Sequence, residues 1–140
     1  MGKILALDHG TKRIGVAICD ELRIIASGLE TIAANDIIVY LRTMFEKEQI
    51  DEVVVGLPVR LNLQESAATQ RVREFIRHLE KKFPERKFVT YDERFTSKIA
   101  ERSMIEAGAK KKQRAKKETI DMISATILLQ DYMSFLSRGV

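Results

Sequence analysis

The sequence predicts an α/β fold in which helices flank a mixed five-stranded sheet. Three observations lead to this prediction. Short apolar runs separated by tight turns occupy roughly the first quarter of the chain, and the hydrophobic pattern then alternates between helical and strand periods. The chain ends in a long helical pattern. Strands joined by tight turns pair antiparallel, whereas strands separated by a helix can pair in parallel.

The first three strands are predicted at residues 3–8, 13–19 and 24–32. Each range contains bulky apolar residues, and turn-forming residues follow the first at 10–12 and the second at 20–21. Connections this short exclude a parallel crossover, which needs a dozen or more residues. The three strands are therefore expected to be antiparallel.

Helices and strands then alternate. Asn35 can cap a helix over residues 36–47, and apolar residues at helical spacing predict a second helix over 65–82. Short β-branched or apolar runs predict strands at 52–56 and 87–91, the first of them fully buried. These α/β crossovers complete the five-stranded sheet.

The last part of the chain is expected to be helical. A helix over 96–106 would end at Gly108, and a helix over 117–136 is apolar nearly all round, which predicts that it is buried. The resulting order, βββαβαβαα, is the topology of a ribonuclease H-like fold. No linker or repeat divides the sequence, so residues 1–140 are expected to form one domain.

Composition narrows the class of protein. The chain has 140 residues, 45% of them hydrophobic, which is enough for a core. Its apolar runs fall short of the ~20 residues of a membrane span. Asp8 comes too early for a signal peptide, and the single cysteine, Cys19, cannot form an internal disulfide. We expect a soluble, cytoplasmic protein.

The positive charge of the chain is local. The net charge is +4, but residues 110–117 contain six bases and no acid, so the remainder carries 18 bases and 20 acids. Such a segment either attracts phosphates, with salt-dependent binding, or only aids solubility. On charge alone the solubility interpretation is slightly favoured, and a candidate site beside the segment would favour contact with nucleic acid instead. The six bases are Lys110, Lys111, Lys112, Arg114, Lys116 and Lys117.

Three carboxylates occupy positions that are costly for a charge. Asp8 ends the first strand, Glu93 follows the fifth, and Asp121 lies in the apolar last helix. The carboxyl ends of central parallel strands meet at one sheet edge, where α/β proteins bind ligands. Carboxylates without histidine or thiol suit Mg²⁺ or Mn²⁺. Two such ions can activate water and stabilise the leaving oxygen of a phosphodiester.

Each carboxylate also has a structural interpretation. Asp8 could cap the turn that follows it, and Glu93 could pair with Arg94 or Arg13. Asp121 could cap its helix or pair with nearby lysines, since the helix dipole stabilises carboxylates near the N-terminus. Its apolar surroundings argue against a purely surface pair.

Other reactive side chains rank lower. Asp92 and Asp20 are alternatives for the third ligand. His9 follows the first carboxylate, so strand alternation should point it away, in a structural role. His78 lies among charged residues and is expected on the surface, and Cys19 is expected in the core.

The segment Asp8-x-Gly10-Thr11 also resembles the phosphate-binding turn of actin, sugar kinases and heat-shock ATPases. Those enzymes close two such domains around ATP, and 140 residues supply only one. A kinase or ATPase is therefore disfavoured. What remains is a backbone-lined turn from which Lys12 and Arg13 can reach phosphate.

Four motifs in order resemble the YqgF family, also called RuvX, which is related to the RuvC-type Holliday-junction resolvases. They are ILALDHGTKRIGVA at 4–17, VVGLP at 54–58, DERFTS followed by AER within 92–102, and the last helix, with Ile-Asp and Ser-Ala, within 120–132. The chain departs from the family at His9, where an apolar or aromatic residue is usual. It also departs at 59–66, which lacks the usual glycine.

The resemblance implies a ribonuclease H-like fold and a divalent-metal nuclease. By motif position it implies Asp8, Glu93 and Asp121 as the catalytic, metal-binding triad, with Mg²⁺ or Mn²⁺ as cofactor and two ions when substrate is bound. It implies a cytoplasmic role in maturing the 5′ end of 16S rRNA. The alternatives are Holliday-junction resolution and a non-catalytic nucleic-acid-binding module of ribosome assembly.

The expected partner is nucleic acid, with structured RNA favoured over branched DNA. The expected contacts are Lys12, Arg13, Arg94 and the basic segment 110–117. The protein is expected to be a monomer, or a dimer if it resolves two-fold symmetric junctions.

Overall fold

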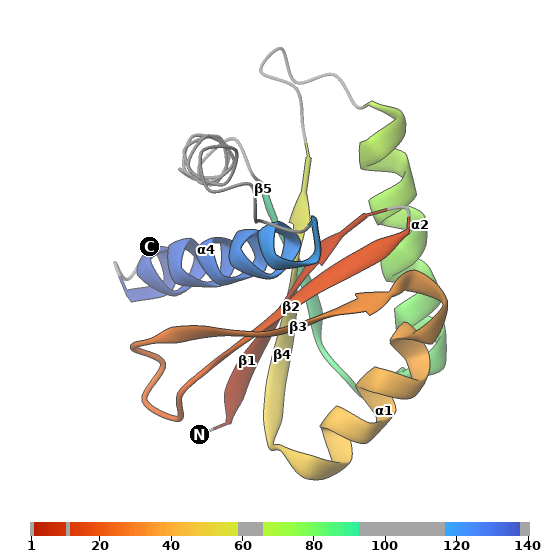
Figure 1. The fold of residues 1–140 in the computed structure, drawn as a ribbon. Coiled ribbons are helices and arrows are strands. Elements are labelled where there is room, and N and C mark those ends of the chain that lie inside the picture. The colour runs from red at the N-terminus through yellow and green to blue at the C-terminus, as the bar shows by residue number, and fades with distance from the viewer. Residues whose placement is uncertain (1, 11, 59–65, 93–116, 138–140) are drawn as a thin grey trace, which may run out of the picture.

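The computed structural model describes residues 2–10, 12–58, 66–92 and 117–137. Its elements follow one another in the predicted order, and the helix predicted over 96–106 lies outside the described residues. The strands are β1 (Lys3–His9), β2 (Arg13–Cys19), β3 (Ala26–Ala33), β4 (Ile50–Leu57) and β5 (Phe88–Asp92), and the helices are α1 (Ile37–Lys47), α2 (Ala67–Lys82) and α4 (Lys117–Ser137) (Figure 1).

The strands form one mixed sheet in the order β3-β2-β1-β4-β5. The strands β1, β2 and β3 pair antiparallel, whereas β4 pairs in parallel with both β1 and β5. The predicted mixed five-stranded sheet is therefore confirmed. Since β1 and β4 lie at its centre and run parallel, their carboxyl ends share one edge.

Strand alternation divides the core into two layers. On one face, Leu5 and Leu7 of β1 pack with α1 and α2, and on the other, Ile4 and Ala6 pack with α4. Figure 1 shows α4 crossing the sheet on the side away from α1 and α2. We call these two sides the α4 face and the α1/α2 face.

The last helix is buried only along the side that meets the sheet, whereas its apolar pattern predicted a buried helix. Its buried residues are Ile120, Ser124, Ala125, Leu128, Leu129, Tyr132 and Met133. Near its C-terminal end, Phe135 and Leu136 are more than one-third exposed, so the apolar surface continues beyond the buried side. No helix among the described residues is long and apolar enough to cross a membrane.

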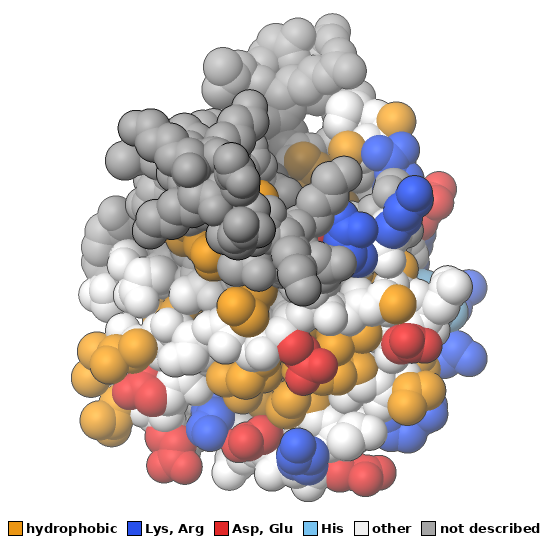
Figure 2. Space-filling model, in the orientation of Figure 1, with side chains coloured by type: hydrophobic (Ala, Val, Ile, Leu, Met, Phe, Trp, Pro, Cys, Tyr) orange, Lys and Arg blue, Asp and Glu red, His pale blue; other side chains and the backbone are white. Residues whose placement is uncertain are grey.

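Several predicted boundaries differ from those in the structure. The third strand begins at Ala26 instead of residue 24, because Asp20 holds the backbone of Ile24 and Ile25 in a turn. Their side chains, with that of Leu22, are exposed, and Figure 2 shows hydrophobic side chains gathered at this hairpin.

Asn35 does not cap α1. It lies inside a 3₁₀ turn at Ala34–Asp36, and Asp36 becomes the N-cap without a side-chain capping bond. The second helix begins at Ala67, two residues after the predicted start, because Ser66 and Thr69 form a reciprocal capping box.

Candidate active site at the carboxyl end of β1

Asp8 lies near the carboxyl end of β1 and is only 9% exposed. It follows Ile4 and Ala6 in the strand alternation and therefore lies on the α4 face. His9 lies on the opposite face, where its ring packs 4.4 Å from that of Phe75, measured between centroids. The predicted orientation of His9 is confirmed, and burial lowers the pKa of its imidazole.

Gly15 of β2 brings Asp121 to Asp8. Gly15 is the antiparallel partner of Asp8, so the two residues share the α4 face. A Cβ built on Gly15 would lie 2.5 Å from the carbonyl carbon of Asp121 and 3.1 Å from the backbone nitrogen of Met122. The backbone of α4 therefore rests directly on β2 beside Asp8, which puts Asp121 on the same face and at the same end of the sheet as Asp8.

Asp121 forms an ion pair with Arg13. The Nε of Arg13 donates to Oδ2 of Asp121 at 3.2 Å, and the Asp121 side chain is 14% exposed. Arg13 lies two residues before Gly15 and therefore on the same face of β2. The sequence indicated pairing with nearby lysines as an alternative for Asp121, whereas the structure supplies an arginine from a distant strand.

Ser124 adds a buried hydroxyl one helical turn after Asp121. It is 1% exposed, and its Oγ has no hydrogen-bond partner within the described ranges. Sequence reasoning had not assigned a role to Ser124 or Gly15. An isolated glycine in a strand can signal close backbone approach, and a small polar residue in an apolar helix can signal a site, so both signals were present.

The structure describes only some of the remaining predicted site residues. Lys12 is exposed at the turn between β1 and β2. Figure 2 shows Lys and Arg side chains gathered near this end of the sheet. Glu93, Arg94 and residues 110–116 lie outside the described residues, as does the side chain of Lys117.

Neither alternative third ligand shares the site of Asp8. Asp92 pairs with Leu57, which belongs to the core on the α1/α2 face, so strand alternation places Asp92 on that face. Asp20 lies at the other end of β2, where its Oδ1 accepts hydrogen bonds from the backbone nitrogens of Ile25 and Ile24. These bonds lower the pKa of the Asp20 carboxyl. Asp20 is a turn-stabilising residue, and its role as an alternative ligand is wrong.

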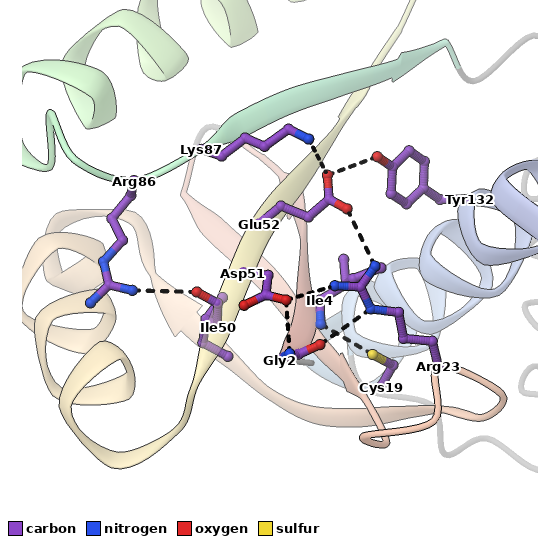
Figure 3. Close-up of polar contacts among 10 residues, drawn as sticks. All are labelled: Gly2, Ile4, Cys19, Arg23, Ile50, Asp51, Glu52, Arg86, Lys87 and Tyr132. Atoms are coloured by element: carbon purple, nitrogen blue, oxygen red, sulfur yellow. Dashed lines mark hydrogen bonds and ion pairs between the residues drawn. The ribbon is translucent and has the colours of Figure 1, made fainter.

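A second buried carboxylate, Glu52, lies at the opposite end of the sheet (Figure 3). It accepts a hydrogen bond of 3.0 Å from the Tyr132 hydroxyl and lies 3.5 Å from Lys87 Nζ and 4.0 Å from an Arg23 nitrogen. Burial and the bond to Glu52 raise the pKa of Tyr132 to about 12. Protein cations compensate this charge, so Glu52 anchors the C-terminal half of α4 to β4.

Cys19 and His78 match their predicted structural roles. Cys19 is buried, and its Sγ accepts a hydrogen bond from the Ile4 nitrogen, while burial raises the pKa of the thiol. His78 is exposed on α2.

The described part of the site fits a hard cation. The carboxylates of Asp8 and Asp121 are the oxygen donors that hard cations prefer, and they come from two elements held together at Gly15. In the structure the Asp121 carboxylate is paired with Arg13. Within the described residues, no group of three or more His, Cys, Asp or Glu side chains could hold a metal ion. The third predicted carboxylate, Glu93, lies outside them.

Comparison with known proteins identifies relatives over almost the whole chain. The family model RuvX, described as Holliday junction resolvase, matches residues 2–135. A protein of Flavobacterium psychrophilum named "putative pre-16S rRNA nuclease" is 48% identical over 134 residues, covering 96% of this chain and 98% of its own. A protein of Christiangramia forsetii with the same name is 48% identical over 133 residues, covering 95% and 98%.

Two solved structures resemble the fold. The RuvC of T. thermophilus in complex with a Holliday junction has a TM-score of 0.57 at 11% identity, covering 95% of this chain and 96% of its own. The fowlpox virus resolvase complex has a TM-score of 0.54 at 15% identity, covering 96% and 98%. At these identities the likeness concerns the fold, which is ribonuclease H-like. The match to the family model and the identity to its relatives show that this chain belongs to the RuvX family.

Proposed function

We propose that this protein is a metal-dependent nuclease that matures the 5′ end of precursor 16S rRNA. The observation that carries the proposal is the meeting of Asp8 and Asp121 beside Gly15, at the carboxyl end of central parallel strands. The relatives named for pre-16S rRNA support the substrate. A cytoplasmic monomer is the form that we propose for this activity.

Asp8 and Asp121 would hold Mg²⁺ or Mn²⁺, and Glu93 would complete the triad. A pair of such ions, expected when substrate is bound, supplies activation of water and stabilisation of the departing oxygen. The contribution of the protein is rigidity. Because the α4 backbone lies against Gly15, Asp121 cannot approach or withdraw from Asp8 without breaking the β2–α4 contact.

Basic residues would hold the substrate backbone. Lys12 and Arg13 leave the turn that follows Asp8 and would contact phosphates near the cut. Arg94 would orient Glu93 or contact phosphate. The six bases of 110–117 would bind the backbone away from the cut, which gives affinity without sequence choice.

The composition favours recognition of backbone and shape. Aromatic residues are 6% of the chain and tryptophan is absent, so unstacked bases have few platforms. Structured RNA fits this mode of recognition, but branched DNA also does. The family model's description, Holliday junction resolvase, makes junction cleavage the second candidate function.

One gel separates these functions. Wild-type protein and Asp8→Asn are incubated with Mg²⁺ or Mn²⁺ and either precursor 16S 5′-end RNA or a four-way DNA junction. We expect cleavage of the RNA by the wild type and none by the variant. Symmetric nicking of the junction alone would indicate a resolvase and a dimer. Salt-sensitive binding of both substrates without cleavage would indicate the non-catalytic assembly module.

A further inference from the structure

The ion pair between Arg13 and Asp121 lies within the proposed metal site. Arg13 comes from the start of β2 and Asp121 from the first turns of α4, and the two meet on the α4 face beside Gly15. The Nε of Arg13 lies 3.2 Å from Oδ2 of Asp121, and both side chains are partly exposed, so the guanidinium can exchange this carboxylate for another anionic partner.

The surroundings explain why a cation is needed at this position without a metal. The Asp121 side chain is 14% exposed and lies on the same face and end of the sheet as a second carboxylate, Asp8, which is 9% exposed. Two largely buried carboxylates repel each other and lose hydration, so a neighbouring positive charge stabilises both. The guanidinium of Arg13 supplies that charge, and its side chain, 32% exposed, retains access to solvent.

We propose that Arg13 is the counter-ion of Asp121 in the metal-free protein and that the metal must displace it. The inference rests on the proposed function, because it assumes that Asp121 is a metal ligand. A divalent ion and the guanidinium compete for the same carboxylate. Once displaced, Arg13 is available to the substrate phosphate, so that the metal-loaded site is also the one ready to bind RNA.

The direction in which metal affinity changes when Arg13 is replaced distinguishes this role from simple positioning of Asp121. If Arg13 only oriented Asp121, removing it would weaken metal binding. If Arg13 competes, removing its charge strengthens metal binding, because the guanidinium and the divalent ion repel each other. At a separation of about 6 Å this repulsion changes the metal affinity about tenfold, even at the dielectric constant of water.

The test is isothermal titration of the full chain with Mn²⁺, without nucleic acid. Arg13→Gln removes the charge, and Arg13→Lys keeps the charge and serves as the matched control. We expect Arg13→Gln to bind Mn²⁺ about tenfold more tightly than the wild type, and Arg13→Lys to stay within about threefold of it. Equal or weaker binding by Arg13→Gln would overturn the inference and leave the metal site intact.

Two further outcomes separate the inference from the function on which it rests. If neither the wild type nor Arg13→Gln binds Mn²⁺, the metal site fails and the inference fails with it.

Thermal melting shows whether Arg13→Gln is folded. Without metal, Arg13→Gln should melt below the wild type, because Asp121 has lost its counter-ion, and saturating Mn²⁺ should remove that difference. A melting difference that persists in saturating Mn²⁺ would mean that Arg13 has a purely structural role.

Discussion

Replacing Gly15 by alanine should damage one defined contact, that between β2 and α4. The new Cβ would lie 2.5 Å from the Asp121 carbonyl carbon, whereas ordinary van der Waals contact begins at 3.4 Å. The helix backbone must therefore withdraw by at least 0.9 Å (3.4 − 2.5). Because the opposing atoms belong to the backbone, no change of rotamer relieves the clash.

The withdrawal has two costs. Overpacking a core costs ~1–3 kcal/mol, and a backbone clash belongs at the upper end, so we expect a loss of about 2–3 kcal/mol and a melting temperature lower by roughly 7–10 °C. Displacing Asp121 from Asp8 by nearly 1 Å should also lower the rate of cleavage by about 100-fold, as misplaced catalytic groups do.

Gly28→Ala is the matched control. A Cβ on Gly28 would meet side-chain atoms of α4 instead of backbone, namely Met122 Cγ at 2.7 Å and Thr126 Oγ1 at 3.0 Å. Methionine can change its rotamer, so stability should change by less than about 1 kcal/mol and cleavage by less than about threefold. Circular dichroism melts measure the stability of each variant, and RNA cleavage assays measure its activity. If the two variants behave alike, or if Gly15→Ala is fully stable and active, the contact at Gly15 does not hold Asp121 in position.

Three further predictions follow from single contacts or segments. Tyr132→Phe should cost about 1–2 kcal/mol in urea unfolding at pH 7, because buried Glu52 loses a donor, and cleavage should persist. The raised pKa of Tyr132 means that its stabilisation is complete below pH 10 and is lost between pH 10 and 12, so this variant should show a flatter stability profile there. His9→Phe should keep its kcat/KM and the wild-type pH profile, since the ring packs against Phe75, and a loss of activity would restore a catalytic role. Replacing the six bases of 110–117 by Gln should flatten the log–log salt dependence of RNA binding by about 3.5–4.5, and an unchanged slope would remove that segment from the interface.

Local patterns in the sequence were enough to predict the sheet. Tight turns at 10–12 and 20–21 leave the first three strands no parallel arrangement, and β-branched runs separated by helices supply the rest. Boundaries were wrong where a side chain overrode the pattern. Asp20 accepts hydrogen bonds from the backbone of Ile24 and Ile25, which therefore precede the third strand instead of belonging to it. Asn35 lies within a 3₁₀ turn and so does not cap the first helix.

The candidate site could be predicted only in outline. Asp8 was identifiable because a carboxylate ends a buried strand, and Asp121 because it interrupts an apolar helix. Their meeting depends on Gly15, and the Arg13–Asp121 ion pair joins residues more than 100 positions apart. Neither contact follows from local periodicity, because each depends on where α4 crosses the sheet.

A divalent ion held jointly by Asp8 and Asp121 can be located by anomalous diffraction from a crystal of this protein soaked in Mn²⁺. We expect an anomalous peak bonded to carboxylate oxygens of both Asp8 and Asp121, with Glu93 as the third carboxylate. A crystal that binds Mn²⁺ elsewhere, or with neither of these aspartates as a ligand, would contradict it.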